Sequence, residues 1–451
     1  MRLPNLSEKF KFRAALALCV LAYLLHFSAI IKYAVNVPYW DEWEILQPYG
    51  DLANPSFGQF LAQHNEHRIT TTKILTFALY QFDGWNIVTH QIVNFIIYGF
   101  AVTLLIYIIY KNVPRLPAWI LLVFTIFLLT TVNWENHFWA FQTQFHCALL
   151  FLFLAVWFLF AERQAWSDAL LGVLWTLLLV YSLSAGLVET IALTTVYACF
   201  KIFRIKRAEN RAREIFQLVA VCVLIGAVIG SYFVGYVKPE HHPPYTLPYE
   251  KRFWVYFLNL LSGGFGYKVA NILPGSIIFL FAAVPLAGEI YKRRGDLSRE
   301  AWTIAALMIS VFAALVSIVM GRAAFGTGHS KASRYAEIVV VLIPLSVAMW
   351  TLFLEETFKF RRYVLAAFWL FCFGSFLSYW NFWKVYRQTA HDRQQGVECI
   401  KNYYANGGAA NCPTIYPHPI PERLEANRNF DQSSLTEIRK SIARPPAEIE
   451  K

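Results

Sequence analysis

Several runs of about 17–20 almost purely apolar residues restrict the fold of this chain more than any other feature, because each is long enough to cross a hydrocarbon layer as a helix. Examples are Ala14–Ile31, Leu116–Val132 and Trp302–Met320. Backbone groups in lipid must be paired within their own segment, so we expect helices rather than open strands. Only 15% of the residues are charged, against about a quarter in soluble domains. The mean hydropathy of +0.41 points the same way.

The sequence therefore predicts an all-α polytopic membrane protein with about eleven transmembrane helices. The first apolar run is too long for the core of a signal peptide and no A-x-A site follows it, so we expect a retained helix. Residues 1–383 are expected to form the transmembrane domain, with a first outer loop at 35–87, and residues 384–451 a polar tail. The expected spans are 14–34, 88–110, 116–132, 145–161, 168–184, 187–203, 215–237, 274–291, 301–321, 336–354 and 363–383.

The distribution of Lys and Arg predicts which loops lie in the cytoplasm. Alternate loops, beginning with the N-terminus, hold roughly twice as many Lys and Arg as the other set, apart from the tail. By the positive-inside rule the first set is cytoplasmic, and the net charge of +11 is explained by these loops rather than by nucleic acid. Nearly all unusual polar motifs then fall on the outer face. We expect a multi-pass protein of a bacterial inner membrane with its site facing the periplasm.

The first outer loop begins with the sequence VPYWDEWE, which places Asp41 and Glu42 at the end of the first span. One interpretation is a solvated turn in which Asp41 caps the following residues. The other is a general base at the membrane surface, with Asp41 the first candidate and Glu42 the second. The rest of the loop has helical periodicity but too many polar residues to cross, so it predicts amphipathic helices in the interface.

The same loop contains HNEHR, with His64, Glu66, His67 and Arg68. His64 and His67 would share a face of a helix, and with Glu66 they could hold zinc. We favour a hydrogen-bonding surface for sugar hydroxyls or phosphate, with Arg68 as a phosphate ligand.

The segment NWENHFWAFQTQFH at 133–146 alternates aromatic rings with amides, a carboxylate and histidines. Aromatic rings stack on the C–H faces of sugars and polar groups bind their hydroxyls, so Trp134, Glu135, His137 and Gln142 are candidate sugar or acceptor ligands. A belt of interfacial aromatic residues is the competing interpretation.

The segment GRAAFGTGHSKASRY is the most basic outer loop. It predicts a donor-phosphate site made by Arg322, Lys331 and Arg334, because guanidinium groups suit bidentate phosphate contacts. His329 is a further candidate sugar or acceptor ligand. Anchoring to lipid head groups is the alternative.

Seven cysteines are present. Five lie in or near spans, whereas Cys399 and Cys412 occur in the polar tail. In an oxidising compartment these two could form a disulfide.

An acidic pair just after the first helix, followed by the NWENHFWAFQTQF and GR…SRY segments, resembles the GT-C superfamily of membrane glycosyltransferases. It is similar to bacterial members such as O-antigen-modifying glucosyltransferases. The resemblance implies transfer of a sugar from a polyprenyl-phosphate carrier at the outer leaflet to a glycan, lipid or protein acceptor. In that superfamily an acidic residue of the first loop is the base, a role that Asp41 or Glu42 would match.

The chemistry of such a transfer agrees with the residues present. Phosphate is a good leaving group, so a base for the incoming hydroxyl and cations for the phosphate suffice. A divalent metal is not required for a monophosphate donor, although zinc or magnesium stays open. Direct displacement inverts the donor anomer. The expected partners are the lipid-linked donor, the acceptor and membrane lipids, with no nucleic acid. A lipid-linked saccharide transporter or flippase, or a surface-polysaccharide polymerase or ligase, is the alternative.

Overall fold

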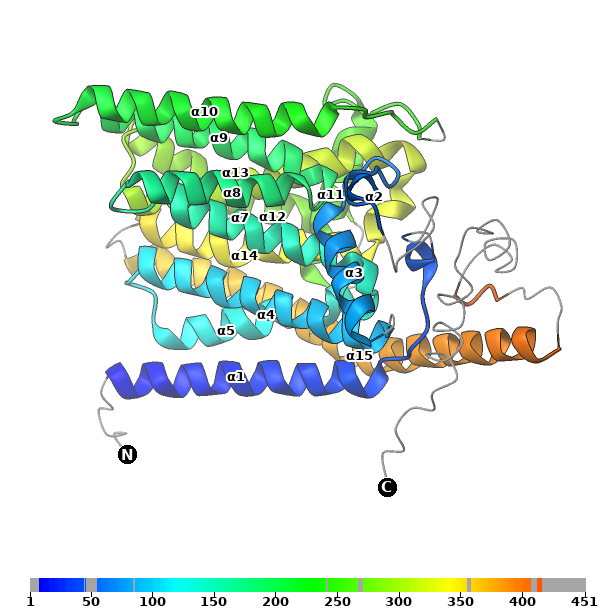
Figure 1. Ribbon diagram of the computed structural model, residues 1–451. Coiled ribbons are helices and arrows are strands. Elements are labelled where there is room, and N and C mark those ends of the chain that lie inside the picture. The colour runs from blue at the N-terminus through cyan, green and yellow to red at the C-terminus, as the bar shows by residue number, and fades with distance from the viewer. Residues whose placement is uncertain are drawn as a thin grey trace, which may run out of the picture.

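The computed structural model describes residues 8–43, 45, 55–83, 86–240, 242–266, 271–354, 358–406 and 412–415. Within these ranges all regular secondary structure is helical, apart from one isolated backbone pairing between His64 and His67. Most helices run side by side as a bundle (Figure 1). The all-α prediction is confirmed for this part of the chain.

Nine helical segments of the described chain are long and apolar enough to cross a membrane. They agree with nine of the eleven expected spans. The other two expected spans are helical but have shorter apolar stretches, Trp166–Val180 and Arg362–Leu377. The nine candidate spans are Lys9–Tyr33, Ile87–Asn112, Ala118–Phe138, Ala140–Leu159, Ser184–Ile205, Arg211–Phe233, Ile272–Lys292, Arg299–Phe325 and Ser333–Leu354.

The helices that contain these spans differ in burial according to their place in the bundle. The helices α7 (Thr143–Leu159), α13 (Arg299–Arg322) and α14 (Ser333–Leu354) are buried along most of their length and form the core. The outermost helices in Figure 1, α1 (Glu8–Tyr33) and α10 (Arg211–Phe233), expose leucine, valine and phenylalanine side chains. An apolar exposed face is what contact with lipid requires. The remaining long helices are α4 (Ile87–Asn112), α8 (Trp166–Val180), α9 (Ser184–Ile205) and α12 (Ile272–Lys292).

Polar side chains cap several of these helices where the apolar runs begin. Asn86 Oδ1 accepts a hydrogen bond from the Val88 amide at 3.0 Å, and Ser298 Oγ accepts one from the Ala301 amide at 3.2 Å. Each cap satisfies a backbone N–H that has no partner within its helix. The sequence therefore marks the helix starts locally.

One end of the bundle carries the short helices and irregular segments, and we call it the pocket end; it is at the right of Figure 1. The expected amphipathic helices of the first loop occur here as α2 (Phe57–Leu61) and α3 (Thr70–Asp83), and Figure 1 shows α3 lying across the bundle direction. The other short elements of the pocket end are η1 (Trp40–Glu42), η2 (Thr131–Asn133), α6 (Trp134–Phe138), η3 (Ala140–Gln142), α11 (Lys251–Leu261), η4 (Ser262–Phe265), η5 (Ala323–Phe325) and η6 (Thr327–Lys331). The helix α5 (Ala118–Leu128) leads into η2.

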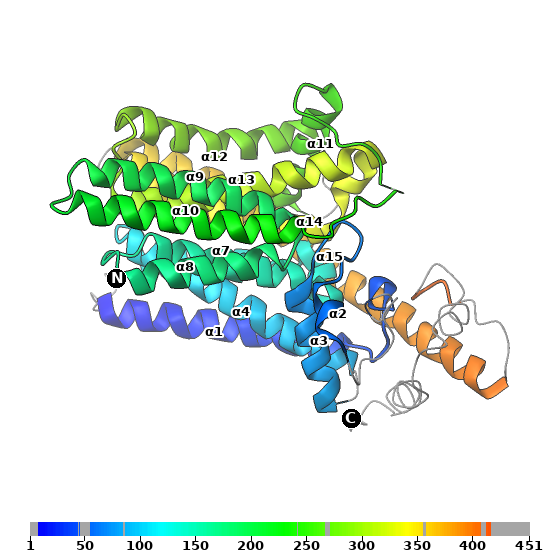
Figure 2. The same cartoon turned by 45° about the horizontal axis from the view of Figure 1, so that its top comes forward.

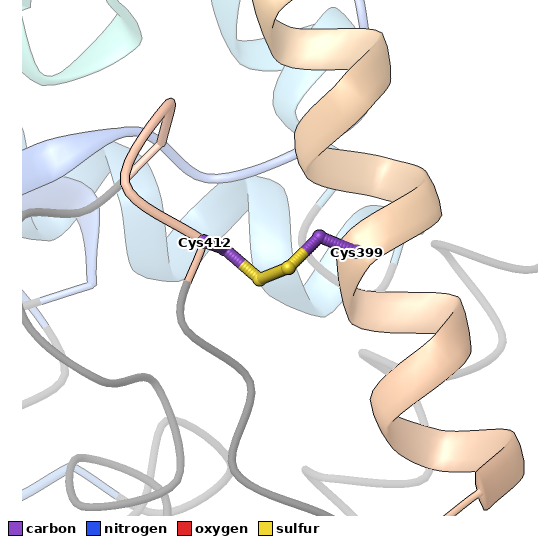
Figure 3. The surroundings of a disulfide bond; sticks show 2 residues. All are labelled: Cys399 and Cys412. Atoms are coloured by element: carbon purple, nitrogen blue, oxygen red, sulfur yellow. A yellow bond between two sulfur atoms is a disulfide. The ribbon is translucent and has the colours of Figure 1, made fainter.

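The last helix, α15 (Phe358–Asn406), continues well beyond the expected boundary at residue 383 and projects past the other helices in both views (Figures 1 and 2). The expected disulfide between Cys399 and Cys412 is present, with a Cα–Cα distance of 5.9 Å (Figure 3). It fixes residues 412–415 against α15. Residues 407–411 and 416–451 of the predicted tail lie outside the described residues.

Candidate functional site

A cavity of about 320 Å³ opens at the pocket end. Segments between Asp41 and Tyr335 line it: the turn after α1, the HNEHR motif, η3 and the starts of α7, α9 and α14, together with the last turns of α10 and α13. Seven of the predicted site residues lie in its wall: Asp41, His64, Glu66, His67, Gln142, Arg322 and Arg334.

The turn that carries Asp41 has an unusual backbone. Trp40 has a φ of 46°, a left-handed conformation that is costly for a residue with a side chain. Hydrogen bonds hold it there: the Trp40 amide donates to the carbonyl of Ile415 at 2.8 Å, and the Trp43 amide donates to the carbonyl of Trp40 at 3.0 Å. The turn directs Asp41 to the cavity, where it interacts electrostatically with Arg334.

Glu42, the neighbour of Asp41, has a different environment. It is buried and does not line the cavity. Its two carboxyl oxygens accept hydrogen bonds from the amides of Tyr39 at 2.7 Å and Phe141 at 3.1 Å. Burial raises the pKa of Glu42 to about 7, although Arg393 and the backbone N–H groups lower it. Glu42 therefore joins the Asp41 turn to η3, and the structure separates it from the cavity that holds the other candidate base.

Two arginines and a tyrosine form the cationic wall of the cavity. Arg322 ends α13 and its Nε donates to the hydroxyl of Tyr335 at 3.2 Å. The guanidinium of Arg334, at the start of α14, lies 5.3 Å from the centre of the Tyr335 ring and 5.8 Å from that of Trp139. The aromatic faces restrict the guanidinium while its N–H groups stay in the plane available to an anion.

Each guanidinium also has a carboxylate beside it. Glu66 forms a salt bridge with Nη2 of Arg322, whose Nε bonds to Tyr335. Glu135 Oε2 accepts a hydrogen bond from the backbone amide of Arg334 at 3.0 Å and lies 3.8 Å from its Nη1. Glu135 does not line the cavity. Its position is behind Arg334, where it orients that residue.

The HNEHR motif is a tight turn and not the helix that the spacing of its histidines predicts. His64 and His67 exchange backbone hydrogen bonds of 2.8 and 2.9 Å, and Asn65 between them has a left-handed φ of 49°. Asparagine tolerates this conformation better than most residues, which explains why a turn forms here. The turn therefore fixes the positions of the two imidazoles, and they do not share a helical face.

The side chains of this turn form a charged cluster in the cavity wall. Glu66 Oε1 lies 3.2 Å from His67 Nε2, and Glu66 Oε2 lies 3.3 Å from His242 Nε2. Burial alone would raise the pKa of Glu66, but His67 and Arg322 lower it well below its usual range. Burial lowers the pKa of His64 to about 3, so its imidazole is neutral. Glu66 is therefore a carboxylate paired with the guanidinium of Arg322.

Arg68 does not face the cavity, contrary to its predicted role as a phosphate ligand. Its guanidinium donates hydrogen bonds to the backbone carbonyls of Leu61 at 2.5 Å, Tyr232 at 2.8 Å and Val234 at 2.5 Å. These contacts connect the first outer loop to the end of α10. The sequence did not reveal this role because the acceptors are backbone carbonyls, and those of Tyr232 and Val234 are more than 160 residues away.

The NWENHF segment is likewise mainly structural. Glu337 of α14 is fully buried, and its Oε2 accepts hydrogen bonds from Asn133 at 2.9 Å and Asn136 at 2.8 Å and lies 3.0 Å from His146 Nε2. Burying a carboxylate is costly unless such partners are present. This network holds the segment in the bundle.

Other predicted ligands lie outside the cavity wall. His137 is fully buried, with its Nδ1 3.3 Å from His26 Nε2 and 3.3 Å from the hydroxyl of Tyr386. Trp134 packs against the hydrophobic core. His329 and Lys331 are exposed on η6 and do not line the cavity. Local composition could not distinguish these positions from Gln142, which is buried and lines the cavity.

Reasoning from the sequence missed several lining residues, of which Tyr335 and Ser184 have clear polar contacts. Tyr335 connects the two arginines, and Ser184, the first residue of α9, has its hydroxyl oxygen 2.7 Å from Nδ1 of His67. Tyr335 adjoins Arg334 in the SRY motif, so the motif itself carried a signal. Ser184 had none, since its partner comes from the first loop.

Among the described residues, no three His, Cys, Asp or Glu side chains gather in a way that could hold a metal ion. The zinc interpretation of HNEHR therefore has no support from this arrangement. No protein family of known type matches the chain, and no curated protein matches it.

Proposed function

We propose that this protein is a membrane glycosyltransferase of the GT-C kind. It moves a sugar from a polyprenyl-phosphate carrier to a glycan, lipid or protein acceptor. The pocket end faces the periplasm of a bacterial inner membrane, as the bias of Lys and Arg between loops suggests. The observation that carries the proposal is the meeting of Asp41, Arg322 and Arg334, from distant parts of the chain, around one cavity.

The reaction follows from the charges in that cavity. The acceptor hydroxyl gives its proton to the carboxylate of Asp41 while its oxygen attacks the anomeric carbon of the donor. The bond between that carbon and the phosphate oxygen breaks, and its electron pair leaves with the polyprenyl phosphate. Arg322 and Arg334 stabilise the charge that develops on the phosphate. Because the attack is a single displacement, the product has the inverted anomeric configuration.

Glu66 and Gln142 supply polar groups for the sugar hydroxyls, and the rings of Trp139 and Phe141 supply apolar faces. A cavity that combines a few polar groups with aromatic walls suits a sugar, which has polar edges and C–H faces. Neutral His64 can accept or donate a hydrogen bond there. A divalent metal has no role in this scheme, because the two guanidinium groups serve a monophosphate.

A transporter of lipid-linked saccharide is the second candidate, and one observation favours it. Glu337 and His146 are ionisable, fully buried and located in candidate spans, a placement common in transport proteins. The hydrogen bonds of Glu337 to the NWENHF segment explain its burial structurally. We therefore rank transport below transfer.

Both candidates can be tested with the purified protein in sealed vesicles that contain a labelled polyprenyl-phosphate sugar. A transferase moves the label to an added acceptor and leaves free polyprenyl phosphate. A flippase moves the intact donor to the opposite leaflet without breaking the sugar–phosphate bond. Intact donor crossing the bilayer, with no label on any acceptor, would replace our proposal with the second candidate.

A further inference from the structure

We propose that the disulfide-closed segment 412–415 and Arg393 of α15 position Asp41 for its reaction. This inference rests on the proposed role of Asp41 as the base. It makes the C-terminal part of the chain, which contributes no side chain to the cavity wall, a requirement for the rate of sugar transfer.

The part of α15 beyond the other helices packs by one face. Tyr386, Arg393 and Ile400, spaced seven residues apart, are all buried. Residues at this spacing share a face of a helix. The centre of the Tyr386 ring lies 4.1 Å from the centre of the Phe138 ring, so this face begins at the bundle and continues beyond it.

Arg393 reaches the turn after α1 from this face. Arg393 is 2% exposed, and the central carbon of its guanidinium lies 4.7 Å from the centre of the Tyr39 ring. It also interacts electrostatically with Glu42, the residue that joins the turn to η3. Burying an arginine is costly unless the groups around it compensate for lost hydration. Tyr39 and Glu42, on either side of Asp41 in the sequence, compensate in part through a ring face and a carboxylate, while Nε and Nη1 of Arg393 have no hydrogen-bond partner among the described residues.

The segment after α15 holds the same turn from another side. The carbonyl of Ile415 accepts a hydrogen bond from the amide of Trp40 at 2.8 Å, and Ile415 itself is fully buried. Trp40 is the residue with the left-handed backbone, so this hydrogen bond acts where the conformation is least favourable. Losing it would let the turn relax and move Asp41.

Three features keep Ile415 in place. The disulfide connects Cys412 to α15, as Figure 3 shows, and the Ile415 amide donates to the carbonyl of Cys412 at 3.1 Å. Gly396 provides space: a Cβ added there would lie 2.3 Å from the Ile415 side chain. The other five cysteines are free, so a reductant acts on this one bond.

The test uses the intact protein and compares three forms with the wild type: the wild type treated with reductant, Cys399→Ser combined with Cys412→Ser, and Gly396→Ala, which retains both cysteines. Cys199→Ser is the matched control, because Cys199 is exposed and free. Hydrogen–deuterium exchange of the peptide containing Trp40, together with kcat and donor affinity, is measured for each.

We expect the Trp40 amide to exchange about tenfold faster in the three altered forms, because its acceptor is released. We expect kcat to fall about tenfold or more while donor affinity is unchanged, because the base moves but the arginines do not. Cys199→Ser should match the wild type. Unchanged exchange at Trp40 would overturn the positioning role, and so would a fall in donor affinity as large as the fall in kcat. Exchange needs no turnover, so a wild type without transferase activity would refute the proposed function and leave this readout intact.

Discussion

The VPYWDEWE and NWENHF segments both combine tryptophan with carboxylate side chains, yet the structure uses them differently. In the first, Asp41 lines the cavity beside Arg334. In the second, Asn133 and Asn136 point into the bundle and donate to Glu337. The difference shows that composition identifies polar segments. The residues around a polar side chain then determine whether it can act on a ligand or only stabilises the fold. Asn133 and Asn136 bond to a buried carboxylate and stabilise the fold, whereas Asp41 borders the cavity and a guanidinium and can act on a ligand.

The largest expected effect concerns VPYWDEWE, the segment whose Asp41 lines the cavity. Asp41→Asn retains the size of the side chain and removes the base, so we expect sugar transfer to fall by about 10²- to 10⁴-fold. Transfer from a labelled polyprenyl-phosphate sugar measures it. Asp296→Asn is the control, because it makes the same change in a carboxylate that does not line the cavity, and it should transfer at near the wild-type rate. Full activity in Asp41→Asn would reject Asp41 as the base.

The next effect concerns NWENHF, the segment whose asparagines bond to buried Glu337. Glu337→Ala leaves the donors of Asn133, Asn136 and His146 without their acceptor, and we expect a loss of about 3 kcal/mol in the free energy of unfolding. Thermal unfolding in detergent measures the loss. Ser346→Ala is a control on the same helix, since its hydroxyl only returns to the carbonyl of Leu342. A Glu337→Ala protein as stable as the wild type would show that the network is not structural.

A smaller effect separates the arginines that line the cavity from the basic residues that do not. Arg334→Ala should weaken donor binding by about 2 kcal/mol, roughly 30-fold, because a charged hydrogen bond to phosphate is lost. Lys331→Ala is the matched control on the exposed loop and should bind the donor normally. Equal losses in both variants would indicate a diffuse electrostatic effect instead of a defined phosphate site.

The smallest effect concerns pH and the carboxylate that is not in the cavity. Because burial raises the pKa of Glu42 from its ordinary 4.5 to about 7, the folded state binds more protons than the unfolded state between these values. Its contribution to stability therefore falls as the pH rises, by about 1 kcal/mol between pH 6 and pH 8. Glu42→Gln should lose this dependence, as measured by unfolding at both pH values. An unchanged pH dependence in that variant would place the titration elsewhere.

Local pattern was enough for much of the architecture. The long apolar runs predicted the helices, since hydropathy and length are properties of a continuous segment. The cysteine pair in the tail was recognised from the contrast with cysteines in spans, and the structure confirms its disulfide. Convergence of Asp41, Arg322 and Arg334 was also expected, because all three motifs were assigned to one face of the membrane.

The tertiary structure alone decided which residue of each motif faces the cavity. Asp41 and Glu42 are adjacent and chemically alike, but only Glu42 has the amides of Tyr39 and Phe141 within reach of its carboxyl oxygens. Arg68 and Arg322 have the same side chain, but the first donates to three backbone carbonyls and the second borders the cavity. The physical reason is that burial and hydrogen bonding depend on neighbours that are distant in sequence, and the pattern of a local segment contains no information about them.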